Sequence, residues 1–282
     1  MHYKIFCFSL FILLSCTRDK NKPYENVNII RDEKEKKPKV KQELKIPSTF
    51  AKSSMILIEL SQSDLEINSW DKDSVLINKV FPEMGNKNSE VYQGNNQIVI
   101  REKSIIKNQK GNTWKINVPK IINLTIRSEN GSVSIKNVSG TFNINCTTGD
   151  IDIENSSTAL QALSQSGDIN LTDWELMGRS KISTSSGKLS IDAKNELAYQ
   201  MSAHTGTDTL SISLNGYPLK MNLEILTFQG GGKVYCDFTT SGIEEFYSDA
   251  LNKYYDLRKV QLNDSYPSSS ISTGNGTIII RR

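Results

Sequence analysis

The chain has 282 residues, of which 37% are hydrophobic and 23% charged, a composition typical of a globular protein with one large domain or two small ones. The formal net charge of +3 is too small for a strongly basic nucleic-acid binder, so we expect no nucleic-acid partner. With only two histidines, His2 and His204, and four cysteines, the chain lacks the residues for histidine-clustered zinc sites or a Cys–His pair, and we expect no metal, no cofactor and no catalytic residue.

Residues 1–15 have the parts of a secretory signal. Lys4 supplies a positive start, and Ile5–Leu14 is a ten-residue apolar run broken by one serine. Such a run is too short to span roughly 30 Å of hydrocarbon as a helix. The following Leu-Leu-Ser-Cys resembles a bacterial lipobox, which predicts that 1–15 is a cleaved lipoprotein signal peptide and that the lipid on Cys16 attaches the protein to a membrane. The alternative is an ordinary signal peptide with an incidental cysteine.

Residues 16–47 are predicted to form a charged tether. From 17 to 47 the chain carries ten Lys or Arg and six Asp or Glu, so this stretch holds all of the basic excess. It has too little apolar surface to fold, and as a random coil it would reach about 30 Å. A basic arm for anionic lipids is the alternative, which the interleaved acids weaken.

Residues 48–119 contain short alternating segments that predict β-strands. They are separated by Asp, Gly and Asn turns, and they fall at 56–60, 65–67, 75–77, 97–100 and 114–118. We expect this region to be an N-terminal β cap that covers the first coil of the repeat in residues 120–282, described next. Without a cap, the open end of such a repeat would expose edge strands.

Residues 120–282 repeat around glycines. The first five are spaced by 18, 18, 20 and 19 residues, at Gly131, Gly149, Gly167, Gly187 and Gly206. Apolar or small residues stand seven, five and three positions before the glycine, and apolar residues follow two and four positions after most of them. This pattern predicts two short strands per repeat and a parallel β-helix, or solenoid, with coils of 18–20 residues.

The same alignment makes two further predictions. It places Tyr199 and Met201 in the inner columns of the Gly206 coil, and it gives the corners at Gly206 and Gly230 two extra residues each. Residues 239–268 break the pattern as an insertion, after which the final coil returns with Gly276.

Several strings resemble the bacterial putative-adhesin family of β-solenoid envelope domains of unknown function. They are LEINSW, SVLIN, WKINVPK, NLTIRSENGSVSI, NVSGTFNINCTTGDIDI and ISTGNGTIII, and together they cover roughly residues 50–282. The resemblance implies an extracytoplasmic repetitive β-structure with a binding or adhesive role, and no established catalytic residues.

The insertion supplies the candidate partner-binding residues. These are Phe246, Tyr247, Tyr254, Tyr255 and Arg258, which lie within thirteen residues of one another. Aromatic residues beside charges are common in protein contacts and in sugar recognition. The alternative is a helix or hairpin that folds back over the solenoid and buries its apolar side.

Other candidates favour structural roles. Cys146 and Cys236 would lie about four coils, or about 19 Å, apart, which predicts free buried thiols rather than a disulfide. Asp150, Asp152 and Asp168 predict a solvated acidic edge, with a calcium site as the alternative. His204 is expected on the surface, and the three tryptophans are expected to pack in the core or the cap.

These features predict a lipid-anchored cell-envelope protein with a non-catalytic, adhesin-like solenoid that serves binding or structural presentation. The expected partner is an envelope protein or a glycan. A polysaccharide-processing β-helix enzyme, or a sensor or accessory factor that acts through a protein partner, are the alternatives. Thr17 stands where an Asp would favour inner-membrane retention in some Gram-negative bacteria, which points to the outer membrane.

Overall fold

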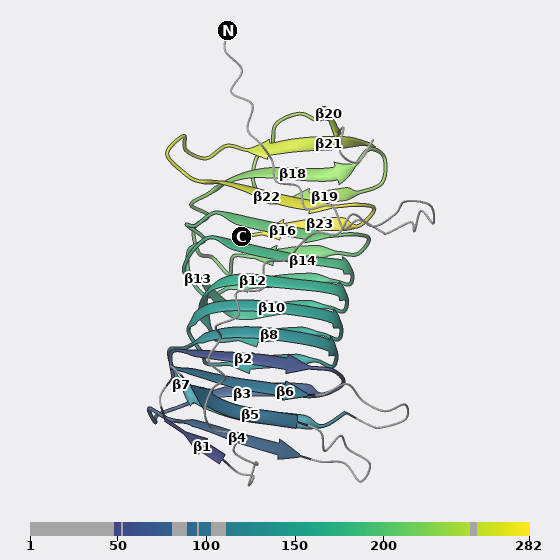
Figure 1. The fold of residues 1–282 in the computed structure, drawn as a ribbon. Coiled ribbons are helices and arrows are strands. Elements are labelled where there is room, and N and C mark those ends of the chain that lie inside the picture. The colour runs from purple at the N-terminus through teal and green to yellow at the C-terminus, as the bar shows by residue number, and fades with distance from the viewer. Residues whose placement is uncertain (1–47, 52, 81–88, 95, 103–110, 249–252) are drawn as a thin grey trace, which may run out of the picture.

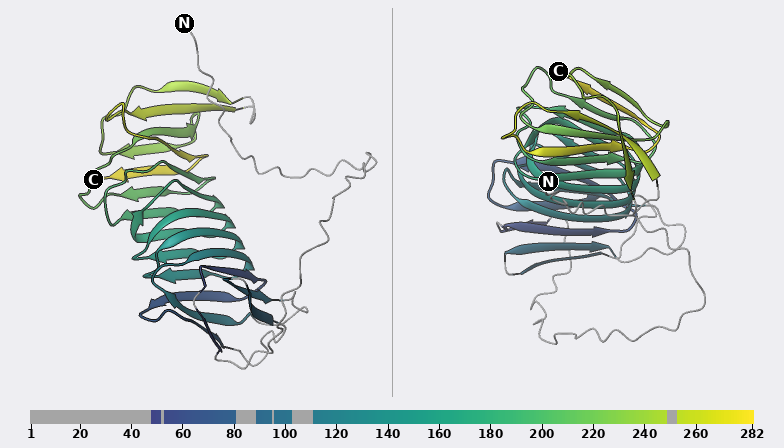
Figure 2. Two further views of the ribbon diagram at one scale, coloured as in Figure 1. Left: turned by 60° about the vertical axis from the view of Figure 1, so that its left-hand side comes forward. Right: turned by 90° about the horizontal axis from the view of Figure 1, so that it is seen from above.

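The computed structural model describes residues 48–282, except 52, 81–88, 95, 103–110 and 249–252. Within these residues the chain forms 23 β-strands and no helix, and hence no helix that could cross a bilayer. The strands stack in two facing layers from the first described residues to a C-terminal hairpin (Figures 1 and 2). The expected all-β solenoid is therefore confirmed, whereas the leader, the tether and Cys16 lie outside the described residues.

In the described part of the chain, one layer, the front sheet, is a ladder of twelve strands. In spatial order these are β5 (Ser89–Gly94), β6 (Gln97–Glu102), β2 (Met55–Leu60), β8 (Asn123–Asn130), β10 (Gly140–Thr148), β12 (Ser157–Ser166), β14 (Ser180–Ser186), β16 (Met201–Thr205), β22 (Ser268–Thr273), β18 (Asn222–Phe228), β21 (Lys253–Val260) and β20 (Glu244–Ser248). The pairs from β6 to β18 are parallel, and those with β5, β21 and β20 are antiparallel.

The other layer, the back sheet, has eleven strands among the residues that the structure describes. In the same direction these are β1 (Ser48–Phe50), β4 (Val75–Val80), β7 (Thr113–Pro119), β3 (Asp64–Trp70), β9 (Val133–Lys136), β11 (Ile151–Glu154), β13 (Ile169–Leu176), β15 (Leu189–Ala193), β17 (Leu210–Ser213), β23 (Thr277–Arg281) and β19 (Lys233–Cys236). Only the pairs with β1 and β4 are antiparallel.

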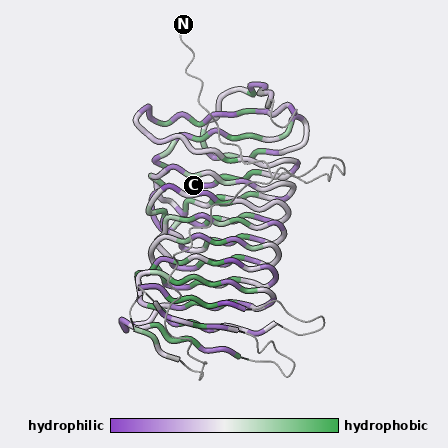
Figure 3. The backbone as a smooth tube through the Cα atoms, in the orientation of Figure 1, coloured by the Kyte–Doolittle hydropathy of each residue, from purple (hydrophilic) through white to green (hydrophobic). Residues whose placement is uncertain are grey.

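Alternation along each strand builds the core. Equivalent residues of successive coils pair in register, so that Ile126, Ile144, Ala162 and Ile182 form one column with no exposed surface. The residues between them face solvent, and apolar and polar segments accordingly alternate along every coil in Figure 3. A side-chain period of two therefore separates a dry interior from a polar surface.

The glycine corners are required by close packing between coils. Gly167 has a φ of +150°, and a Cβ atom there would lie 2.2 Å from the carbonyl oxygen of Gly149 in the preceding coil. A non-glycine side chain would therefore meet both strain and a clash. Small inward hydroxyls complete the corner, since Thr184 Oγ1 donates a hydrogen bond of 2.9 Å to the carbonyl of Gly167.

The predicted register around Gly206 is wrong by two residues. Met201 pairs with Ser180 rather than Ile182, and Ala203 pairs with Ile182. The position equivalent to Gly187 is therefore occupied by Asp208, and the corner has no two-residue insertion. Tyr199, expected in an inner column, is instead 47% exposed. The register of this coil is therefore set by strand pairing and by the burial of Ala203, and not by aligning Gly206 with the earlier glycines.

The N-terminal region is more than a cap. β2–β3 and β6–β7 are full parallel coils, and of the described strands only β1, β4 and β5 cover the end as antiparallel strands. Moreover, β2–β3 lies between β6–β7 and β8–β9, so the first coil of the chain is the second coil of the stack. Residue 120 therefore does not separate a cap from the solenoid.

The C-terminal end shows the same interlacing. The last coil, β22–β23, pairs with β16–β17 on one side and with β18–β19 on the other. Figure 1 shows this yellow coil between the green strands β16 and β18. The chain thus skips one layer after β17 and fills it with its final residues.

Candidate functional site

The insertion forms a hairpin that lengthens the front sheet. β21 pairs antiparallel with β18, and β20 pairs antiparallel with β21, so the hairpin continues the ladder at the end of the stack (Figure 1). Because directly opposite residues share a face, the register assigns each predicted binding residue to the inner or the outer face of this sheet. The hairpin is therefore a structural continuation of the sheet as well as the aromatic element expected from the sequence.

Tyr255 lies on the outer face and is largely buried. It stands opposite Phe228, with the two ring centroids 4.9 Å apart in an edge-to-face arrangement. Lys253 Nζ lies 4.4 Å from the centre of the Phe228 ring. Burial raises the pKa of the Tyr255 hydroxyl. Tyr255 therefore fastens the hairpin to β18, and the side chain of Phe246, opposite it in the register, lies outside the described residues.

Tyr247, Tyr254 and Arg258 lie on the inner face, the face that continues the core. Burial decreases along this face of β21, because Val260 is 1% exposed and Tyr254 is 52% exposed. Tyr247 is 40% exposed, and its ring centroid lies 4.7 Å from that of Tyr254. Arg258 is half-buried, and its Nη1 has no hydrogen-bond partner within the described part of the chain.

Two carboxylates missed by the sequence analysis lie beside the tyrosine pair. Glu245 and Asp256 stand directly opposite each other on β20 and β21. Glu245 Oε1 accepts a hydrogen bond of 2.8 Å from Gln229. Like charges at opposite positions of a ladder destabilise each other. Alternation places them on the inner face, but only the hairpin register, which the sequence does not specify, brings them together.

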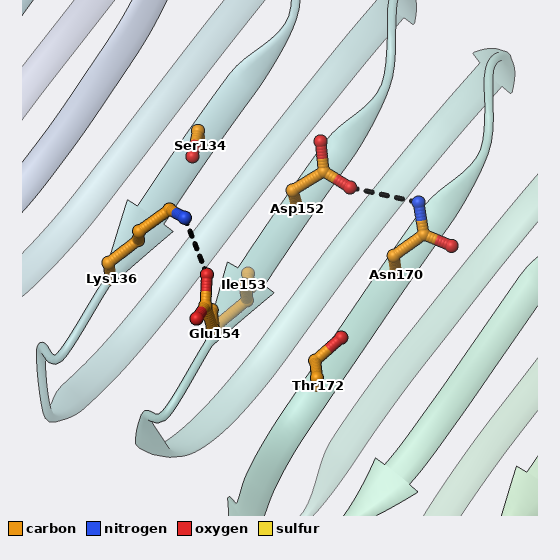
Figure 4. Close-up of a pocket in the computed structure, with 7 residues that line it drawn as sticks. All are labelled: Ser134, Lys136, Asp152, Ile153, Glu154, Asn170 and Thr172. Atoms are coloured by element: carbon orange, nitrogen blue, oxygen red, sulfur yellow. Dashed lines mark hydrogen bonds and ion pairs between the residues drawn. The ribbon is translucent and has the colours of Figure 1, made fainter.

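The outer surface of the back sheet contains a shallow polar hollow. It has a volume of about 220 Å³ and is lined by Ser134, Lys136, Asp152, Ile153, Glu154, Asn170 and Thr172. Figure 4 shows its charged groups paired across neighbouring strands, with Lys136 Nζ 2.5 Å from Glu154 and Asn170 Nδ2 donating to Asp152 at 2.8 Å. The lining offers hydrogen bonds but no aromatic ring for sugar stacking, so the hairpin is the stronger candidate.

The acidic edge expected from the sequence is a hydrogen-bond ladder between coils. Asp150 Oδ1 accepts the backbone N–H of Asp168 at 2.8 Å, and Asp168 Oδ1 accepts that of Lys188 at 2.8 Å. Each carboxylate thus binds the next corner, and Asp152 lies apart in the polar hollow. The described residues contain no group of three His, Cys, Asp or Glu that could hold a metal ion.

The remaining candidates have structural positions. Cys146 and Cys236 are free thiols, as predicted, but only Cys146 is buried and Cys236 is half-buried. Their coils are five steps apart, because β22–β23 lies between them. Burial raises the pKa of Cys146 to about 12, which makes it a poor nucleophile at neutral pH. His204 is half-buried rather than exposed, with Nδ1 2.9 Å from Ser272 Oγ.

A fully buried ion pair at the N-terminal end was not anticipated. Lys79 Nζ lies 3.7 Å from Glu102 Oε1, and neither side chain is exposed. Glu102 Oε1 also accepts hydrogen bonds from Ser63 at 2.6 Å and from Trp114 Nε1 at 2.9 Å. This network joins β4, β6 and β7 with the corner between β2 and β3, and Trp114 packs in the core as predicted.

A family model described as Toastrack DUF4097 matches residues 25–220, more than half of the chain. The chain belongs to the Toastrack family. The resemblance stated from the sequence strings is thereby confirmed. The Toastrack match ends just before β18, so the hairpin and the final interlaced coil lie beyond the matched residues.

The chain also matches solved structures of bacterial proteins that are described as adhesins or as a cell adhesion protein. A "putative adhesin" from Bacteroides fragilis matches 84% of this chain and 97% of its own, with 14% identity and a TM-score of 0.37. A "putative cell adhesion protein" from Clostridium sporogenes matches 83% and 99%, with 14% identity and a TM-score of 0.31. A "putative adhesin" from Parabacteroides merdae matches 83% and 95%, with 12% identity and a TM-score of 0.32. No protein with a curated description matches the chain.

Proposed function

We propose that this Toastrack protein is a lipid-anchored component of the bacterial cell envelope that binds a partner through the C-terminal end of its solenoid, without catalysis. The observation that carries the proposal is the concentration of exposed apolar side chains at that end. Tyr235, Ile243, Tyr247 and Tyr254 are 58%, 57%, 40% and 52% exposed. Tyrosines are enriched among the residues that dominate binding energy, whereas the coils present mostly short polar side chains.

The geometry of the stack supports presentation away from a membrane. The described chain begins with β1 at one end, and the hairpin lies at the other (Figure 1). Twelve strands at about 4.8 Å each separate the two ends of the front sheet by about 53 Å. If lipid on Cys16 holds residues 16–47 at the membrane, which we propose to be the outer membrane, the hairpin is the end farthest from the tether.

The distribution of titratable groups supports a binding rather than a catalytic role. The acidic ladder at the corners is occupied by hydrogen bonds between coils. In the polar hollow, Lys136 pairs with Glu154, and Asp152 accepts a hydrogen bond from Asn170. The Lys79–Glu102 pair has no exposed surface that a substrate could reach. A catalytic acid or base must come within hydrogen-bond distance of its substrate.

Site-specific photo-crosslinking in intact cells tests the proposal. A benzoylphenylalanine in place of Tyr247 should form adducts with an envelope protein or glycan, and Tyr254→Ser in the same chain should reduce their yield at least tenfold. The matched control places the crosslinker at Tyr217, which is 42% exposed but lies outside the hairpin. Equal adducts at both positions, or none at Tyr247, would show that the binding surface is elsewhere.

A further inference from the structure

The two sheets end at different heights at the C-terminal end of the stack. The front sheet continues past β18 with β21 and β20, whereas β19 is the last strand of the back sheet. Within the described residues, β23 is the only strand that pairs with β19. Among the described strands, therefore, none of the back sheet lies opposite the inner face of the hairpin.

The free side of β19 presents backbone hydrogen-bonding groups. The N–H groups of Lys233 and Asp237 donate to Gly276 and Ile280 on the side of β23, at 3.2 and 3.0 Å. Because alternate residues of a parallel strand bond to opposite sides, Val234 and Cys236 direct their N–H and C=O groups to the open side. Val234, Cys236 and Phe238 are also only partly buried against the core. An additional strand here would complete both the ladder and the core.

The charges on the inner face of the hairpin indicate which side chain an added strand would present to it. Glu245 and Asp256 are opposite each other and next to the Tyr247–Tyr254 pair, while Arg258 is the one cation among these side chains. The face thus combines an excess of carboxylate with two exposed tyrosine rings. Carboxylates and aromatic faces both attract the ammonium or guanidinium group of a basic side chain.

We propose that an extended peptide segment of a partner protein, with a Lys or Arg on its inward side, adds as a strand to β19 and places that basic residue against Glu245, Asp256 and the two tyrosines. This mode of recognition takes affinity from main-chain hydrogen bonds and specificity from alternate side chains. The inference rests on the proposed function, because it specifies the class of partner for the same end of the molecule.

Binding of two synthetic peptides to the full-length protein in detergent tests this inference. The first probe is acetyl-Thr-Val-Thr-Lys-Thr-Val-Thr-amide, and the second has Glu in place of the Lys. Titration calorimetry should show the Lys peptide binding at least tenfold more tightly than the Glu peptide. Upon saturation, the amide protons of Val234 and Cys236 should exchange more slowly, whereas an association that does not involve strand pairing would leave them unchanged.

Matched variants separate the inner face from the general charge of the hairpin. Glu245→Gln with Asp256→Asn should abolish the tenfold preference for the Lys peptide. The control, Glu244→Gln with Glu224→Gln, removes two carboxylates from the outer face of the same sheet and should leave the preference intact. Circular dichroism melts should be similar for both double variants, because none of the four side chains is fully buried.

Three results would overturn the inference. The first is that neither peptide binds at about 1 mM, or that both bind equally. The second is that the Lys peptide binds without slowing exchange at Val234 and Cys236. The third is self-association of the protein that Glu245→Lys abolishes, which would assign the surface to a second copy. If crosslinking at Tyr247 persists while the peptides fail, the proposed function stands and only the strand-addition inference is lost.

Discussion

Substitutions at inward and outward positions of a solenoid strand have different effects on stability. Ile144 lies in a column where every neighbour is buried, and the adjacent Asn143 is exposed on the other phase of β10. A polar side chain introduced at Ile144 would therefore lie in the dry interior, whereas one introduced at Asn143 would lie in water. Because side chains alternate between the two faces of the strand, neighbouring positions differ in how well they tolerate a polar substitution.

Ile144→Asp should destabilise the fold by more than about 4 kcal/mol, because an unpaired carboxylate is costly to bury. Asn143→Asp should change the free energy of unfolding by less than about 0.5 kcal/mol. Urea unfolding followed by circular dichroism measures both. Equal losses of stability would contradict the two-phase arrangement of the strand.

The Lys79 ammonium makes stability depend on pH in a specific direction. Burial lowers its pKa from the usual 10.5, and the Glu102 carboxylate only partly opposes this effect. Between the lowered folded-state pKa and 10.5 the unfolded chain binds more protons, so the contribution of this group to the free energy of unfolding rises with pH.

The comparison with Lys79→Met isolates that contribution. The free energy of unfolding of the parent minus that of the variant should increase as the pH is raised towards 10.5, and it should level off above that value. Exposed lysines are present in both proteins and cancel. Unfolding in urea at several pH values gives the difference, and a difference that falls with rising pH would show that the Glu102 interaction dominates instead.

Among the structural elements, the final coil, β22–β23, lies between two coils that precede it in the chain. β22 and β23 contribute Ile271, Ile278 and Ile280 to the core, each no more than 1% exposed. Burial of each of these side chains stabilises the fold by about 1.5–3 kcal/mol. The coil also supplies the only ladder that connects β18–β19 to β16–β17 among the described strands. Its insertion therefore ties the hairpin end to the rest of the stack.

Removal of residues 268–282 should release β18, β19 and the hairpin while the central coils stay folded. Amide exchange in β18 and β19 should approach the rate of an unfolded chain, and exchange in β10 and β12 should remain slow. Mass spectrometry of exchanged peptides distinguishes these regions. Unchanged protection in β18 would mean that it can pair directly with β16 once the layer between them is vacant.

In the molecule as a whole, the two ends of the stack differ in structure. The N-terminal end is covered by antiparallel strands and held by the buried Lys79–Glu102 network. The C-terminal end leaves β19 open and places Glu244 and Glu245 on its outermost strand, β20. Charges on an edge strand discourage uncontrolled pairing of sheets. This asymmetry agrees with a protein held at one end and binding at the other.

Cys16→Ala should shift the protein from the detergent phase to the aqueous phase in a partitioning experiment. The physical reason is the loss of acyl chains, each methylene of which stabilises membrane attachment by about 0.8 kcal/mol. Ser15→Ala, next to the same residue, serves as the control and should leave partitioning unchanged. A Cys16→Ala variant that remains as membrane-bound as the parent would show that lipid on this residue is not the anchor.

The repeating unit of the solenoid can be predicted from the sequence. Period-two alternation predicted the inward columns through Ile126, Ile144 and Ile182, and the glycine spacing predicted the 18–20-residue coil. These features are local, because a strand of the solenoid buries alternate residues whichever coil lies above or below it. The aromatic hairpin residues were also recognisable, since they interrupt the repeat.

The order in which the coils stack cannot be predicted from the sequence pattern and is seen only in the folded structure. Every coil presents the same inward pattern, so nothing within one coil specifies that β2–β3 should lie above β6–β7 or that β22–β23 should lie below β18–β19. The shift at Gly206 has the same origin, because ladder pairing with β14 overrides a glycine alignment. The free edge of β19 and the facing carboxylates Glu245 and Asp256 follow from that stacking order and from the hairpin register. They depend on contacts between residues distant in the chain, which a local pattern does not contain.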